Sequence, residues 1–105
     1  MPYVVTEWVR FGYPLKLHEY LAVGLPSVSS ALPELEPFRD VVTLAQTVEE
    51  WSVAIDAAVP LRHDGAQLAR RRAVARENSW EVRVDKFLDA VSSVERSRAD
   101  RVCPA

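Results

Sequence analysis

The stretch from Tyr13 to Pro26 constrains the fold most strongly, because its proline and glycine residues mark both ends of a short helix. Pro14 suits the first helical position, where its missing N–H removes no hydrogen bond. Gly24 suits the position just past the helix, which needs a left-handed backbone, and Pro26 prevents the helix from resuming. The sequence therefore predicts a loop, a helix over residues 14 to 23, a glycine stop and then a strand.

The predicted helix has two distinct faces. Leu17, Tyr20 and Leu21 share one face, since residues three and four apart stack on a helix. Lys16 and Glu19 share another, close to an N-terminus whose free N–H groups and partial positive charge favour phosphate. A Lys and a Glu three residues apart are, by spacing alone, more typical of a solvated pair than of a binding site.

The rest of the chain alternates between strand and helix patterns, which indicates an α/β protein with a mostly parallel sheet. Short β-branched or small-residue runs predict strands at residues 1–5, 26–30 and 41–45. A short helical turn is expected at residues 32–36, and longer helices at 47–59, 66–77 and from 79 or 80 to 91. Ligands of such sheets bind at the carboxyl ends of the strands, where the loop at residues 9–14 is expected.

Two of the predicted helices carry apolar stripes. The helix that opens with the capping-box pattern of Thr47 and Glu50 has a stripe of Trp51, Ala54, Ile55, Ala58 and Val59, and Pro60 is expected to end it. The last helix, capped by Asn78 or Ser79, has a stripe that is expected to be its buried side, formed by Trp80, Val84, Phe87, Leu88 and Val91. Trp51 and Trp80 are therefore predicted to lie in the core.

Composition excludes several classes of function. The 105 residues carry a net charge of −2, and the arginines at 70, 71, 72 and 76 read as a solvated helix face, so nucleic acid is not an expected partner. Cys103 is the single cysteine, so no disulfide can form within the chain, and with two histidines a metal site has almost no support. No apolar run approaches the length of a membrane span, and a cytoplasmic location is expected.

Residues 13–26, which we call the central segment, resemble the donor-binding segment of the GT-B glycosyltransferases, in particular the retaining family 4 group. The residues that carry the resemblance are Pro14-Leu15-Lys16-Leu17, Glu19-Tyr20-Leu21-Ala22, Gly24 and Pro26. Weaker similarities follow in order at residues 29–34, 41–51 and 78–81, so that the match covers residues 3 to 92.

The resemblance implies a partial Rossmann-like parallel sheet flanked by helices, the C-terminal part of a donor-binding domain. Residues 1–92 would form this truncated domain and residues 93–105 a frayed tail. The N-terminal acceptor domain and the first strands of the donor domain would be missing. The implied activity is transfer of a sugar from a nucleotide-sugar donor to an acceptor hydroxyl, without a cofactor, in the cytoplasm or at the inner face of the membrane, and the fragment would be inactive alone.

The resemblance also assigns roles to residues of the central segment. Glu19 would accept hydrogen bonds from the donor ribose, and Lys16 would bind the diphosphate or the sugar. The backbone N–H groups of Gly12 and Leu15 would face phosphate. The family has a second glutamate, which holds the donor sugar, and in this chain Phe11 occupies its position. No residue matches a catalytic base or nucleophile.

A second class of function is open on the same residues. Glu19 also fits a surface carboxylate, Lys16 an exposed lysine and Gly12 an ordinary turn glycine. His18 is expected to be a packing or surface histidine rather than an acid or base. The chain would then be a small non-enzymatic α/β protein that binds a partner through an uncovered sheet edge. In either case the exposed apolar surface predicts a second chain or self-association.

Overall fold

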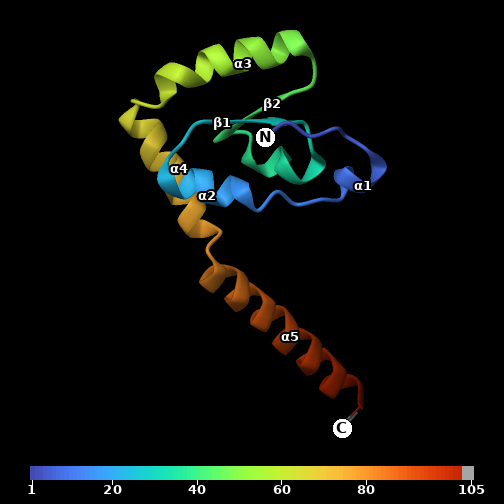
Figure 1. The fold of residues 1–105 in the computed structure, drawn as a ribbon. Helices are drawn as coiled ribbons and strands as arrows, with labels where there is room; N and C mark the ends of the chain where they lie inside the picture. The colour runs from blue at the N-terminus through green and yellow to red at the C-terminus, as the bar shows by residue number, and fades with distance from the viewer. Residues whose placement is uncertain (103–105) are drawn as a thin grey trace.

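The computed structural model describes residues 1–102 and shows a mixed α/β protein that is mostly helical, with a small parallel sheet (Figure 1). The order of helices and strands agrees with the sequence-based expectation from residue 14 onward. Before it, no strand forms at residues 1–5, and residues 7–10, which were expected to lie in a loop, form a short helix. The elements are α1 (Glu7–Arg10), α2 (Lys16–Val23), β1 (Ser27–Ser30), the 3₁₀ helix η1 (Pro33–Phe38), β2 (Val42–Ala45), α3 (Val48–Leu61), α4 (Gly65–Glu77) and α5 (Trp80–Val102).

The sheet consists of β1 and β2, which pair in parallel with Ser27 opposite Val42 and Ser30 opposite Ala45. The predicted strand at residues 1–5 is wrong as a strand, but its first residues do lie along β1. The Met1 nitrogen donates to the carbonyl of Val28 at 2.7 Å, and the Ser30 N–H donates to the Met1 carbonyl at 3.2 Å. The chain leaves this alignment after Tyr3, whose N–H donates to the Ser30 hydroxyl at 2.8 Å.

The core lies on one face of the sheet, between β2 and the pair formed by α2 and η1. Leu17 and Leu21 supply the buried face of α2, as their spacing predicts, and Leu32 and Leu35 meet them from the η1 segment. Figure 1 shows α3 on the opposite side of the sheet. There Ala54 is the one buried residue of α3, so the molecule has one well-packed face and one thinly covered face.

Helix α3 begins as predicted, but its apolar stripe is only partly covered. The Glu50 N–H donates to the Thr47 hydroxyl at 3.1 Å and the Glu50 carboxylate accepts from the Thr47 N–H, so the predicted capping box is confirmed. Ile55 and Val59 are exposed and line an open trough of about 370 Å³ beside Val28 of β1. These two residues remain exposed because no other element of residues 1–102 packs over the trough.

The predicted burial of the α5 stripe is wrong. Trp80 is 71% exposed and Phe87 is 67% exposed, and Val84, Leu88 and Val91 are exposed as well. The cause is that α5, which begins at Trp80, turns away from the body, as Figure 1 shows, so most of the stripe faces no other element of residues 1–102. The resulting radius of gyration is 18.4 Å, against about 13 Å for a compact domain of this length.

Helix α5 also continues to Val102, past the boundary predicted at residue 92. Its start agrees with prediction, because the Ser79 hydroxyl accepts from the Val82 N–H at 3.3 Å. The last residues of the predicted tail, 103–105, lie outside the described residues, and Cys103 is one of them.

Arg71 differs from the other arginines of α4 and is not part of a solvated face. It is 2% exposed, and its guanidinium donates to two backbone carbonyls. Nε binds the carbonyl of Gly24 at 2.8 Å and Nη2 binds the carbonyl of Leu61 at 2.9 Å. These carbonyls lie at the C-terminal ends of α2 and α3, where the helix dipole is negative, so one cation holds both helix ends.

We expect Gly24→Ala to destabilise the protein by about 2 kcal/mol, because Gly24 has φ +88° and an added Cβ would lie 2.1 Å from Leu68 Cδ1. Urea unfolding followed by circular dichroism measures the change. Gly65→Ala is the matched control: its Cβ would meet nothing within 4 Å in the first turn of α4, so equal or slightly higher stability is expected. Equal losses in the two variants would contradict the assignment.

We expect Arg71→Met to lower the free energy of unfolding by about 2 kcal/mol, because two carbonyls lose a charged donor in a buried place. Arg76→Met, on the exposed side of the same helix, should change it by less than about 0.5 kcal/mol. The same urea titrations give both values. An Arg71→Met variant as stable as Arg76→Met would show that the two hydrogen bonds contribute nothing.

Candidate functional site

The N-terminus of α2 presents free backbone donors, as the central segment predicts. Pro14 precedes the N-cap residue Leu15, which has no side-chain capping bond. The first N–H groups that find acceptors are those of Leu17, to the Pro14 carbonyl at 3.1 Å, and His18, to the Leu15 carbonyl at 3.2 Å. The N–H groups of Leu15 and Lys16 have no acceptor within residues 1–102 and so remain available to an anion.

The amide of Gly12 is placed differently from that of Leu15. Its N–H donates to the Val9 carbonyl at 2.9 Å and closes the C-terminal turn of α1. A phosphate at Gly12 would therefore have to displace this bond. Gly12 does line a small hollow of about 150 Å³, together with Trp8, Tyr13 and Pro14.

Lys16 and Glu19 both lie on the exposed side of α2, opposite the buried Leu17 and Leu21. Within the described chain neither side chain makes an ion pair or a hydrogen bond, with each other or with other residues. Neither lines the hollows described here. The structure thus keeps Lys16 and Glu19 together on one turn of helix with both charges free, and their assignment to a donor site remains a prediction.

One open hollow is a feature that sequence reasoning missed. It has a volume of about 660 Å³ and lies at the carboxyl ends of the strands, where β1 ends at Ser30 and β2 ends at Ala45. Its polar and aromatic walls come from segments far apart in sequence, namely Tyr3, Arg10, Gln46 and Trp51. We call it the strand-end hollow. Parallel α/β sheets bind ligands at this end of the strands.

One signal in the sequence points to this hollow. Arg10 lies in the segment expected after the first strand, and Gln46 directly follows the strand that ends at Ala45. Residues that follow segments running in parallel along one sheet gather at the same edge of that sheet. Trp51, which was predicted as core, is half-buried and closes the hollow from α3.

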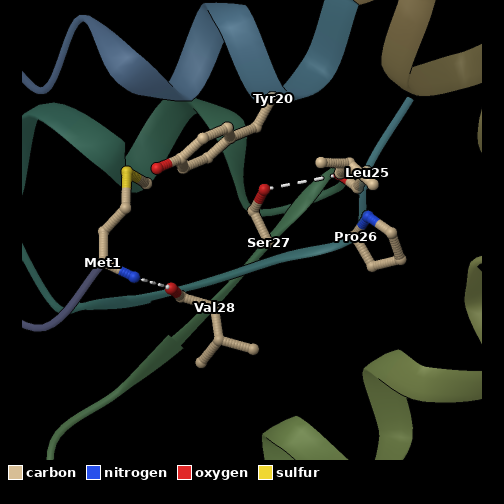
Figure 2. A pocket seen from close by; sticks show the side chains of 6 residues that line it. All are labelled: Met1, Tyr20, Leu25, Pro26, Ser27 and Val28. Carbon is tan, nitrogen blue, oxygen red and sulfur yellow. Dashed lines mark hydrogen bonds between the residues drawn. The ribbon is translucent and has the colours of Figure 1, made fainter. Parts of the chain in front are cut away.

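A second cavity lies near the opposite end of β1 and has the character of a packing gap. Figure 2 shows Tyr20 reaching from α2 toward β1, with the Met1 side chain beside it. The cavity measures about 190 Å³ and its walls include Leu25, Pro26 and Val28. Two of its polar groups already have partners: the Met1 nitrogen donates to the Val28 carbonyl at 2.7 Å, and the Ser27 hydroxyl donates to the Leu25 carbonyl at 3.4 Å. We therefore place no ligand there.

A cluster of Tyr13, His18 and Arg83 joins the loop before α2 to the start of α5. Arg83 Nη2 donates to the Tyr13 hydroxyl at 2.7 Å and approaches His18 Nε2 at 3.1 Å, and the Tyr13 hydroxyl also contacts His18 Nε2. The guanidinium lies 5.0 Å from the centre of the Tyr13 ring. Because a guanidinium only donates, the Arg83 contact is a hydrogen bond in the neutral form of His18 whose Nε2 accepts.

The surroundings of His18 favour this neutral form. Burial and the nearby positive charge of Arg83 both lower the pKa of His18. Phe38 covers one side of the ring edge-on, and Nδ1 is buried without a hydrogen-bond partner within residues 1–102. His18 is thus a packing residue, as predicted, that helps to fix the direction in which α5 leaves the body.

Comparison with known proteins adds no relative: no family model, no curated protein and no solved structure matches the chain. Within residues 1–102 no helix is both long enough and apolar enough to cross a membrane, and no group of three or more His, Cys, Asp or Glu side chains is placed to hold a metal ion.

We expect the protein to lose stability as the pH falls below about 6.5, the ordinary pKa of histidine. The pKa of His18 is lower in the folded state, so the unfolded chain binds a proton first. The stabilisation is therefore fully present at pH values above the pKa that His18 has in the unfolded chain. It is lost as the pH falls through the lower pKa that His18 has in the folded protein. Thermal unfolding at about pH 7.5 and about pH 5.5 measures this difference, which should shrink in His18→Gln. His63→Gln, at an exposed position, should keep the wild-type difference.

Proposed function

We propose that this chain forms the donor-binding half of a GT-B glycosyltransferase, with a Rossmann-like arrangement of which β1 and β2 are part. The observation that carries the proposal is the position of the strand-end hollow. It opens where the two parallel strands end, and α1, which contributes Arg10 to it, leads directly into the loop before α2. A nucleotide-sugar fits this chemistry, since its diphosphate needs cations and free N–H groups beside an open pocket.

In the proposed site the residues at the start of α2 divide the donor between them, and Lys16 and Glu19 lie outside the lining of the strand-end hollow. Lys16 and the free N–H groups at the start of α2 supply positive charge for the diphosphate. Glu19 supplies two acceptor oxygens for a pair of ribose hydroxyls, and it has no partner within residues 1–102 to release first. The resemblance of residues 14–26 to the family's donor-binding segment supports the same division.

Catalysis is not assigned to any residue of the chain. Sugar transfer requires both substrates to be held in position and water to be excluded. The strand-end hollow is open, and Lys16 and Glu19 face solvent. In the proposed enzyme a second wall closes over the donor and carries the acceptor.

A competing function is supported by the trough between α3 and β1. Its apolar lining, which includes Val28, Ile55 and Val59, is suited to a protein partner rather than to a nucleotide. A non-enzymatic binding protein would use this trough and would have no affinity for nucleoside diphosphates.

Calorimetric titration with UDP and GDP tests the proposal. We expect one of the two to bind, and Glu19→Ala to weaken it roughly tenfold or more, because charge-assisted hydrogen bonds to the ribose are lost. Lys16→Ala should weaken it as well. Glu49→Ala, which removes an exposed carboxylate from the first turn of α3, is the matched control and should change nothing.

Two outcomes would contradict this proposal. Binding that is the same in Glu19→Ala and wild type would defeat the assignment of Glu19. A folded protein that binds neither nucleotide would defeat the donor site and favour the binding protein.

A further inference from the structure

The apolar face of α5 has the spacing of a coiled-coil seam. Its apolar residues recur at intervals of four, three, four and three positions, which keeps them on one side of a helix that winds around another helix. We call this face the α5 seam, formed by Trp80, Val84, Phe87, Val91 and Val94. All five are exposed, and Leu88 beside them is exposed too.

The α5 seam faces away from the body of its own chain. The residues of α5 that are partly covered are Val82 and Arg83. At 100° per residue, Val82 lies about 200° around the helix from Trp80, and Arg83 about 60° to one side of it. A second helix can therefore lie along the seam without displacing the contacts of Arg83 with Tyr13 and His18.

We propose that α5 pairs with α5 of a second copy of this chain in an antiparallel coiled coil. The seam and Leu88 leave roughly 700 Å² exposed, close to the about 800 Å² that each partner buries in a standard interface. Two-fold symmetry makes one face its own partner, so both copies are satisfied at once. This inference is independent of the proposed function.

Charge selects the antiparallel direction. Beyond Val94 the seam positions are occupied by Arg98 and Arg101. In a parallel pair each of these arginines would face the same arginine of the second copy, and the like charges would repel. In the antiparallel pair Val84 lies opposite Val94 and Phe87 opposite Val91. Arg98 of one copy then lies over the Trp80 ring of the other, a favourable cation–π arrangement.

The two halves of α5 carry opposite net charges, which fits the same alignment, and of the charged residues Glu81, Arg83 and Glu95 lie directly beside the seam. The first half of α5 carries three acids, Glu81, Asp85 and Asp89, against two bases, whereas the half after Val91 carries three bases, Arg96, Arg98 and Arg101, against two acids. Antiparallel pairing sets one half against the other and opposes the two helix dipoles. It also brings Glu81 near Glu95 of the second copy, and Arg98, one turn from Glu95, offsets that repulsion.

Shape favours this alignment as well. Figure 1 shows the body of the protein gathered at the N-terminal end of α5. A parallel pair would bring two bodies to the same end, whereas an antiparallel pair separates them by the length of the helix. For a helix of 23 residues this is about 35 Å.

Sedimentation equilibrium over a range of protein concentrations tests for the dimer. We expect a monomer–dimer equilibrium in the wild type. In Val91→Asp the dissociation constant of the dimer should be at least about 100-fold higher, because the substitution places a charge in the paired seam. Ser93→Asp adds the same charge on the outer side of α5 and should leave the equilibrium unchanged. Circular dichroism should show the body still folded in Val91→Asp, because Val91 is exposed on α5 and is no member of the core cluster.

Cross-linking tests the direction, in a Cys103→Ser background. Val84→Cys and Val94→Cys chains should form a disulfide with each other when mixed, and neither should cross-link efficiently alone. A chain that is monomeric at every concentration, or a dimer that Val91→Asp leaves intact, would overturn the proposal. Cross-linking of Val84→Cys alone as efficient as in the mixture would show a parallel pair and overturn it as well.

Discussion

The buried guanidinium of Arg71 is the contact on which the rest of the body depends. It reaches from α4 to the C-terminal carbonyls of α2 and α3, helices that lie on opposite sides of the sheet. Each of those carbonyls lies at the negative end of a helix and would otherwise be poorly satisfied. One side chain therefore fixes two layers relative to each other, in a domain whose two strands are too few to do so alone.

Arg71 also affects the candidate site, although it lies far from it along the chain. By holding the C-terminal end of α2 it fixes the helix axis, and so the direction in which the free N–H groups of Leu15 and Lys16 point. The left-handed Gly24 completes this end, since Leu68 of α4 occupies the space that a side chain would need. The packing of α4 against α2 is thus what places Lys16 and Glu19 on the open side of the molecule.

The cluster of Tyr13, His18 and Arg83 plays the corresponding part for α5. It ties the loop at the start of α2 to the first turns of α5, and beyond Arg83 the residues of that helix are exposed as far as Val102. A long helix with one apolar face gains little stability by itself, because most helical stability in proteins comes from packing that face. Within residues 1–102, the α5 seam is therefore a surface that a second helix would stabilise by covering its apolar side chains.

Local patterns in the sequence determined the order of the elements from α2 onward and most of their ends. The glycine stop at Gly24, the capping box at Thr47 and the cap at Ser79 depend on neighbours within a few residues, so they could be predicted. Only the tertiary structure decided that Arg71 is buried while Arg70 and Arg72 are exposed, that the α5 stripe is uncovered, and that Arg10, Gln46 and Trp51 line one hollow. The reason is physical: a stripe of apolar residues shows which side of a helix avoids water, but what covers that side is set by segments distant in the chain.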